Sequence, residues 1–267
     1  MKIWIVGSGT LVPDTRHGAP AHWIEIPGAS ILLDCGGGTV RTLAGLGLNW
    51  AGVSHILLTH FHTDHVGGLA PLLFALKHGL PSKRDDPLIV LGPKGLKAHL
   101  LALATAHGSH VSDPGFPLLL HELTPGEPWQ DPSGAFEVRT IGTRHTPESL
   151  GIRLEAGPDC LGYTGDTGPF SGLSSFFRAC PLLIAECSHP DGWIGENHLT
   201  PSTLASLASE AGVGTLVPVH AYPTLDVETL PERLAEAGFT GRVLPGRDGL
   251  CLRLQENATE VLDSRTF

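Results

Sequence analysis

Short apolar stretches rich in β-branched residues alternate along the chain with segments of helical periodicity. Most of the apolar stretches end at Gly, Pro or Asp, and this alternation predicts an α/β fold. The predicted strands cover residues 2–7, 22–26, 30–34, 53–59, 88–91, 118–123, 136–141, 150–155, 160–164, 181–186, 214–219 and 249–254. The predicted helices cover residues 39–46, 69–78, 94–107, 171–179, 201–211 and 227–237.

Two local patterns refine this picture. Pro27-Gly28-Ala29 separates two predicted strands and is typical of a turn, so these strands are expected to pair antiparallel. Thr200 is a good N-cap residue and Pro201 suits the first helical position, so a helix is expected to begin there. His198 then lies directly outside a helix N-terminus.

The domain organisation follows from length and loop composition. The chain has 267 residues, of which 41% are hydrophobic and 16% charged, as in ordinary folded proteins. Segments 79–87 and 107–117 are rich in Gly, Pro, Ser and Asp and are predicted to be surface loops rather than linkers. We therefore expect one domain that covers residues 1–267.

The balance of charge is acidic, with a formal net charge of −10 and only 17 Lys plus Arg. Such a chain offers no basic footprint for a nucleic-acid backbone. The one short basic run, Lys83-Arg84, is followed by Asp85-Asp86 and is interpreted as a solvated loop.

The cysteines and the N-terminus bear on the compartment. Five cysteines without a CxxC pair are expected to be reduced and mostly buried. The chain opens on Lys2-Ile3-Trp4-Ile5-Val6 without a long apolar leader, and no apolar stretch approaches the length of a membrane span. We expect a cytoplasmic protein that makes no membrane contact.

The densest chemistry follows the predicted strand 53–59. Three imidazoles and one carboxylate fall within six residues, at His60, His62, Asp64 and His65. Both groups are good ligands of divalent metals, and a strand-to-loop turn can aim the first two at one metal and the last two at another. A loop of exposed histidines is the alternative, and the density of ligands argues against it.

The HxHxDH pattern of residues 60–65 resembles the signature of the metallo-β-lactamase superfamily. Three later residues fit the superfamily pattern in the same order: His145 in Gly-Thr-Arg-His-Thr-Pro, Asp166 in Gly-Tyr-Thr-Gly-Asp-Thr, and His220 in Leu-Val-Pro-Val-His. The resemblance implies an αββα sandwich, in which two mixed β-sheets pack face to face with helices on the outer faces.

The resemblance also implies a centre of two divalent metal ions. It implies that His60, His62 and His145 hold one ion, that Asp64, His65 and His220 hold the other, and that Asp166 bridges them. Zinc suits these ligand types best, and Mn or Fe also accept them.

The second half of the chain resembles the ribonuclease Z branch of the superfamily. An apolar strand ends in Glu186, His198-Leu199-Thr200 follows, and His198 lies 22 residues before His220 (220 − 198). The resemblance implies that His198 acts near the substrate phosphate or leaving oxygen and that Glu186 orients it. Otherwise His198 is a water-exposed residue beside a helix, and Glu186 is a salt-bridged carboxylate.

Two further residues each have two interpretations. Asp34, in Leu32-Leu33-Asp34-Cys35-Gly36, is either a hydrogen-bond partner of a ligand His or a turn residue at a strand end. Trp193, on the loop before His198, either stacks on a base or anchors its loop.

Members of the ribonuclease Z branch often carry a long arm that grips transfer RNA, commonly between the ligands matched here by His145 and Asp166. This interval is 21 residues (166 − 145), enough for a hairpin. With the acidic charge, it disfavours transfer RNA. The armless relatives imply a phosphodiesterase that acts on a small cyclic or nucleotide-like phosphodiester.

We expect this reaction to use a metal-bound hydroxide, with Asp64 orienting or deprotonating it and His198 stabilising charge or protonating the leaving alkoxide. The alternatives are a ribonuclease Z-type tRNA 3′ endonuclease, a β-lactam or thioester hydrolase, and a non-catalytic metal-binding protein. A thioester hydrolase would not need His198 and Glu186. Relatives often dimerise, so a homodimer is also expected.

Overall fold

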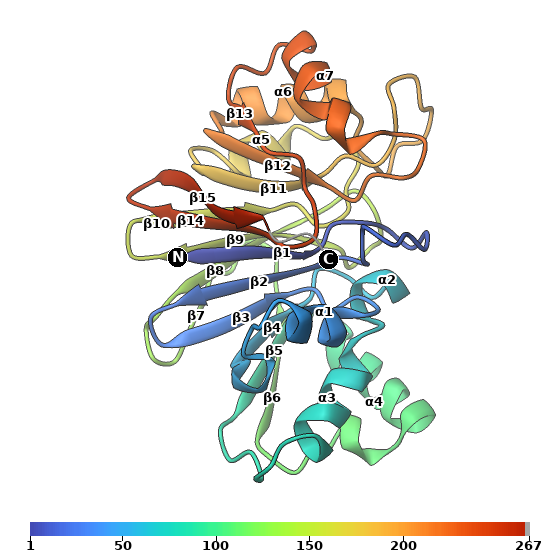
Figure 1. Ribbon diagram of the computed structural model, residues 1–267, viewed down its shortest axis with the longest axis vertical. Coiled ribbons are helices and arrows are strands. Elements are labelled where there is room, and N and C mark those ends of the chain that lie inside the picture. Colours follow the sequence, from blue (N-terminus) through green and yellow to red (C-terminus); the bar gives the residue numbers. More distant parts are fainter. Residues whose placement is uncertain (265–267) are drawn as a thin grey trace.

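The computed structural model describes residues 1–264, which form two mixed β-sheets with helices against them (Figure 1). The first sheet has eight strands in the order β15-β14-β1-β2-β3-β4-β5-β6. Their bounds are β1 Lys2–Gly7, β2 Ala21–Ile26, β3 Ala29–Leu33, β4 His55–Leu57, β5 Leu88–Pro93, β6 Leu118–Leu123, β14 Leu250–Gln255 and β15 Ala258–Ser264.

The second sheet has seven strands in the order β13-β12-β11-β10-β9-β8-β7. Their bounds are β7 Trp129–Gln130, β8 Glu137–Gly142, β9 Leu150–Ala156, β10 Asp159–Tyr163, β11 Leu182–Glu186, β12 Thr215–Val219 and β13 Arg242–Val243. Strands β10 to β13 run parallel, as do β3 to β6 of the first sheet, whereas the other pairs are antiparallel.

The helices fall into two sets: in Figure 1, the set from the second half of the chain lies at the top, and the set from the first half lies from mid-height to the bottom. Four come from the first half of the chain: α1 Thr39–Gly45, α2 Thr63–Val66, α3 Leu69–His78 and α4 Leu96–His107. Three come from the second half: α5 Gly172–Phe176, α6 Pro201–Ala211 and α7 Leu230–Glu236. Short 3-10 turns add η1 Trp50–Gly52, η2 Ser109–Val111 and η3 Val227–Thr229.

Three buried clusters correspond to the layers of this fold. Along β1, Ile3 and Ile5 join the cluster between the sheets, while Val6 joins the cluster beneath the first set of helices. This is the alternation of a strand buried on both faces. The third cluster unites the second sheet with α5, α6 and α7. The predicted α/β sandwich is confirmed.

Most predicted elements are present within a few residues of their expected bounds. The strand expected over 53–59 is shorter, His55–Leu57, and Asp64 and His65 lie in the short helix α2 rather than on an irregular turn. The sequence pattern missed β7, β13 and β15. Two of these are edge strands with two residues each, too short for a periodic pattern.

The interpretation of Lys83-Arg84 as a solvated loop is wrong for Arg84, whose side chain is buried. Its guanidinium donates to the carbonyl oxygens of Ala51, Val53, Asp86 and Pro87, over 2.7 to 2.9 Å. Because buried carbonyls need donors, one arginine can close two loops here.

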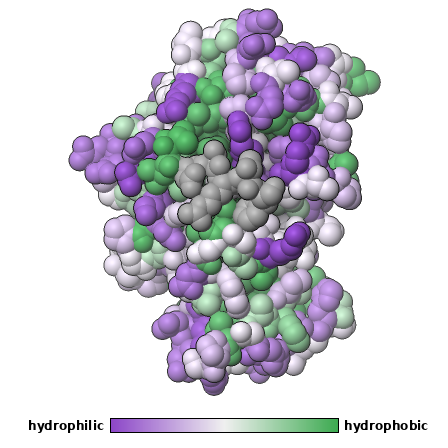
Figure 2. All heavy atoms as spheres, viewed as in Figure 1, coloured by the Kyte–Doolittle hydropathy of each residue, from purple (hydrophilic) through white to green (hydrophobic). Residues whose placement is uncertain are grey.

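The outer surface carries scattered apolar side chains. On the face shown in Figure 2, hydrophobic residues appear in small groups among hydrophilic ones. In the described part of the chain, no helix combines the length and the apolar character needed to cross a membrane.

Several predicted site residues lie at or just beyond the carboxyl ends of parallel strands. Asp34 follows β3, His60 follows β4 by three residues, Asp166 follows β10, Glu186 ends β11 and His220 follows β12. The crevice beyond the carboxyl ends of parallel strands is the usual ligand site of α/β sheets. Both sheets contribute to it here.

Candidate metal centre

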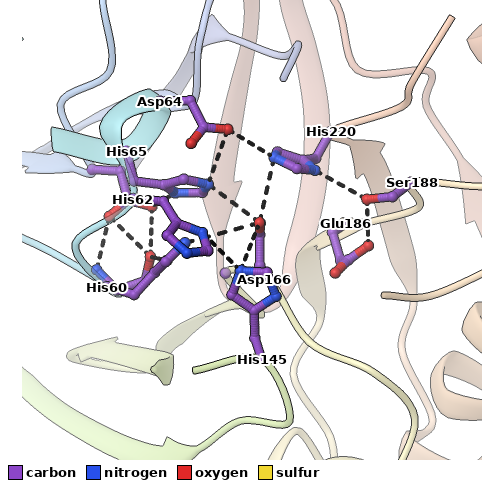
Figure 3. A network of polar contacts seen from close by, with 12 residues as sticks. His60, His62, Asp64, His65, His145, Asp166, Glu186, Ser188 and His220 are labelled. Atoms are coloured by element: carbon purple, nitrogen blue, oxygen red, sulfur yellow. Dashed lines mark hydrogen bonds and ion pairs between the residues drawn. The ribbon is translucent and has the colours of Figure 1, made fainter. Parts of the chain in front are cut away.

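The structure brings the seven predicted metal ligands together, with Asp166 in the middle (Figure 3). The carboxylate oxygens of Asp166 lie 3.3 Å from Nε2 of His65, 3.5 Å from that of His220, 3.6 Å from that of His145 and 3.9 Å from that of His60. One carboxylate therefore faces four imidazoles from three segments of the chain: residues 60–65, the loop at His145 and the loop at His220.

The ligand atoms fall into groups whose members all lie within 4.8 Å of one another. One group is His60, His62, His145 and Asp166, and another is Asp64, His65 and His220. A third group places His198 with Asp166 and His220. The first two groups match the two sets that the sequence pattern implied.

Two buried nitrogens of this arrangement make no hydrogen bond. Nε2 of His60 and Nε2 of His65 approach the Asp166 carboxylate without a hydrogen bond to it, and both side chains are fully buried. Leaving such an atom unsatisfied costs roughly 1–3 kcal/mol. Divalent cations would satisfy both nitrogens and offset the carboxylates, so the donor set fits metal ions.

The surroundings of Asp166 and His60 keep these groups deprotonated, as a metal ligand must be. Burial raises the pKa of Asp166, but His220, His65 and His60 outweigh it and hold that pKa well below its usual range. Burial lowers the pKa of His60. At His65 burial opposes protonation, yet Asp166 and Asp34 raise the pKa well above its usual range. The position favours a positive charge, which a metal ion supplies.

His198 and Glu186 meet beside this cluster. Nδ1 of His198 lies 2.8 Å from Oε1 of Glu186, as predicted, and the interpretation of His198 as a water-exposed residue is wrong because its side chain is only 8% exposed. Burial lowers the pKa of His198, but the hydrogen bond to Glu186 and the charges of Glu186 and Asp166 together raise it above its usual value. Thr200 caps α6 as expected, through its contact with the Thr203 N–H.

Glu186 is itself held on three sides. Its oxygens accept hydrogen bonds from the backbone N–H groups of Thr167 (2.7 Å) and Leu199 (3.1 Å) and from the Ser188 hydroxyl (2.6 Å). Ser188 Oγ also lies 3.0 Å from Nδ1 of His220. Sequence reasoning missed Ser188, which connects Glu186 to the predicted metal ligand His220 (Figure 3).

A family model described as a beta-lactamase superfamily domain matches residues 30–221. The chain belongs to this superfamily. The resemblance found in the sequence is thereby confirmed, and the protein is a metal-dependent hydrolase.

Relatives and solved structures agree with this membership. Ribonuclease Z of Mycobacterium avium (strain 104) is 31% identical over 271 residues, which cover 93% of this chain and 96% of that protein. Two solved structures share the fold. The metallo-beta-lactamase fold protein YhfI from Bacillus subtilis has a TM-score of 0.81 at 22% identity, over 94% of this chain and 97% of that one. The short form of human tRNase Z has a TM-score of 0.77 at 23% identity, over 96% of this chain and 100% of that one.

The interval from His145 to Asp166 contains no arm. It holds β9 and β10, which pair antiparallel with Ala156 opposite Asp159. The predicted hairpin is confirmed, and it occupies the position at which members of the ribonuclease Z branch often carry the long arm.

Asp34 contacts the Nδ1 side of His65, a predicted metal ligand. Its Oδ2 lies 2.7 Å from Nδ1 of His65 and accepts a hydrogen bond from the Tyr163 hydroxyl (2.8 Å), and its Oδ1 accepts from the Thr59 N–H (2.8 Å). Its φ of 54° also makes it a left-handed turn residue, so both interpretations of Asp34 hold. The contact leaves Nε2 of His65 for the metal side.

We expect Asp34→Asn to weaken zinc affinity about 10–100-fold, because an amide cannot accept from His65 and Tyr163 as a carboxylate does. Competition with a chromophoric chelator measures the affinity, and circular dichroism checks the fold. Asp85→Asn, at an exposed carboxylate, is the matched control. Equal affinities for the two variants would contradict this role.

Aromatic side chains stack beside His198. The ring of His189 stacks on Trp193 at 4.2 Å between centroids and on Tyr222 at 4.7 Å, and it lies 5.5 Å from the ring of His198. Trp193 thus anchors its loop through His189. We call these three side chains the aromatic column.

Proposed function

We propose that the protein is a phosphodiesterase that hydrolyses a small cyclic or nucleotide-like phosphodiester with two divalent metal ions, preferably zinc. The observation that carries this proposal is the His198–Glu186 pair beside the predicted ligands. The His198 ring lies 4.9 Å from that of His145 and 5.8 Å from that of His220, between centroids. A buried imidazole at this distance can reach a phosphate that the centre holds.

The two ligand groups assign the metals. His60, His62 and His145 would hold one ion, Asp64, His65 and His220 the other, and Asp166 would lie between them. Bound there, divalent ions act as Lewis acids on a phosphate oxygen and make water a nucleophile at neutral pH.

Asp64 is placed to handle the attacking water. Its Oδ2 lies 3.4 Å from Nε2 of His220. Burial raises the pKa of Asp64, but the hydrogen bond from His220 and the charges of His65 and His220 together outweigh it and lower that pKa, so the carboxylate stays ionised. It can orient the water and accept its proton.

His198 serves the other end of the reaction. Glu186 accepts the hydrogen bond from its Nδ1 and favours the protonated ring. The other ring nitrogen is then a donor for the phosphate oxygen that gains charge, or for the departing alkoxide. A β-lactam or thioester hydrolase has no need of this second donor.

A small substrate is supported by charge and by shape. The net charge of −10 opposes a polyanion, and the hairpin between His145 and Asp166 provides no grip. Arg144, a cation near the centre, is already paired with Glu196. The aromatic column beside His198 offers apolar faces that suit a base or another ring.

The second candidate is a transfer RNA 3′ endonuclease, favoured by the ribonuclease Z relative at 31% identity. It predicts salt-sensitive binding of precursor transfer RNA. We further propose a cytoplasmic location, which the lack of disulfide bonds among the five cysteines of the described residues supports, and a homodimer.

A substrate panel tests the proposal. We expect the zinc-loaded protein to hydrolyse 2′,3′-cyclic nucleotides and bis(p-nitrophenyl) phosphate faster than nitrocefin, a thioester or precursor transfer RNA, measured as kcat/KM. A preference for any of the last three would overturn it.

Within this panel, Trp193→Leu should raise KM for the cyclic nucleotide about tenfold and leave kcat unchanged, because base stacking contributes about 1–3 kcal/mol. The matched control is Ile194→Ala, next to Trp193 and 96% exposed, which should change neither constant. If Trp193→Leu leaves KM at the wild-type value, the column does not bind the base.

A further inference from the structure

Two cysteines lie in contact away from the metal centre. The Sγ atoms of Cys160 and Cys180 are 3.2 Å apart, and both thiols are free. Cys160 belongs to β10, and Cys180 lies in the turn between α5 and β11. Their exposed fractions are 8% and 0%. Neither residue takes part in the proposed mechanism.

Strand β10 and the turn after α5 hold the two sulfurs close together. Cys160 pairs with Glu155 and Gly162 with Arg153 across β9 and β10, so these residues share the sheet face that is covered by helices. A Cβ on Gly162 would lie 2.9 Å from the ring of Phe177, so the glycine lets Phe177 pack closely. The Cys180 N–H donates to the carbonyl oxygen of Phe177 (3.1 Å), which holds the turn over Cys160.

Arg153 holds the same turn and adds a positive charge. Its Nη1 donates to the carbonyl oxygens of Phe176 (2.8 Å) and Arg178 (2.9 Å). The hydrogen bond from the Cys180 thiol and the charge of Arg153 lower the pKa of Cys160 against the effect of burial. The same hydrogen bond and burial raise the pKa of Cys180. Cys160 is therefore the better nucleophile, and Cys180 keeps its proton.

We propose that Cys160 and Cys180 are a modification site that a hydroperoxide converts into an intramolecular disulfide. The pair needs little movement, because the two sulfurs are already in contact and Cys160 is the slightly exposed one. The proposal is independent of the substrate proposed above.

The chemistry balances in two steps. The Cys160 thiolate attacks one peroxide oxygen and the O–O bond breaks, which leaves a sulfenic acid. The other oxygen takes a proton and leaves as water from hydrogen peroxide, or as an alcohol from an organic hydroperoxide. The sulfur of Cys180 then attacks the sulfur of Cys160, and the hydroxyl leaves as water with the Cys180 proton. Two thiols lose two hydrogens in total, and one hydroperoxide accepts the two electrons.

The disulfide would tie β10 to the turn before β11, the strands that lead to Asp166 and Glu186. It closes a loop of the unfolded chain between positions 160 and 180. For a loop of this size, the melting temperature of a chain this long should rise by about 5 °C. A thiol reductant should reverse the rise.

The test uses the metal-loaded protein. It is treated with hydrogen peroxide, alkylated under denaturing conditions and mapped by mass spectrometry. We expect one peptide pair that joins Cys160 to Cys180 with the loss of two hydrogens, alkylation of the other cysteines, and a melting temperature that rises and then falls back with dithiothreitol.

Matched variants separate this result from general oxidation. Cys251→Ala, at a similarly buried thiol, should keep the crosslink and the thermal shift. Cys180→Ala should lose both and leave Cys160 as a sulfenic acid or its trapped adduct. Peroxide that leaves both thiols of the wild type alkylatable, or that joins a different pair, would overturn the proposal, and this mapping needs no variant to fold.

Discussion

Replacing Asp166 with alanine is expected to reduce kcat/KM for a phosphodiester by about a thousandfold or more, because Lewis-acid stabilisation contributes several kcal/mol. Its carboxylate lies within 3.9 Å of Nε2 of four histidines, so both ligand groups depend on it. The variant should also bind less metal.

Metal content by mass spectrometry and kcat/KM are measured on the same preparation. Glu127→Ala, at an exposed carboxylate outside the predicted ligand set, is the control and should retain both metal content and kcat/KM. An Asp166→Ala protein with full metal content and full turnover would show that Asp166 does not bridge the centre.

Removing the His198 imidazole has the second largest expected effect. His198→Ala should lower kcat for a phosphodiester about 10²–10³-fold and leave the metal content unchanged, because a positioned proton donor contributes on this scale. Glu186→Gln should lower kcat less, since it perturbs the orientation of His198 rather than removing it. Neither variant should change KM much.

His78→Ala, at an exposed imidazole of α3, controls for loss of a histidine as such. A His198→Ala protein that loses one metal would make His198 a ligand, as its proximity to Asp166 and His220 allows. Unchanged kcat on every phosphodiester would instead remove the observation that carries the proposed function.

The centre could be predicted because its residues are either adjacent or follow strands. The cluster from His60 to His65 is contiguous, and His145, Asp166 and His220 each stand at a strand end. The contact between His198 and Glu186 followed from the ribonuclease Z pattern. That residues 1–267 form one domain stays a prediction.

The rest depends on contacts between distant residues that leave no local pattern. Tyr163 and Thr59 meet on Asp34 across two sheets, and Ser188 joins Glu186 to His220. The Cys160–Cys180 contact likewise needs the turn after α5. The burial of Arg84 was not predicted, because its carbonyl acceptors include Val53, which lies 31 residues away and leaves no mark on the charged run around Arg84.

The most direct test of a dinuclear hydrolytic centre follows metal content and phosphodiesterase activity together through chelation and reconstitution. We predict two zinc ions per chain in the active protein, loss of activity as they are removed, and recovery when zinc is restored. Full activity in a preparation stripped of metal would contradict the central claim.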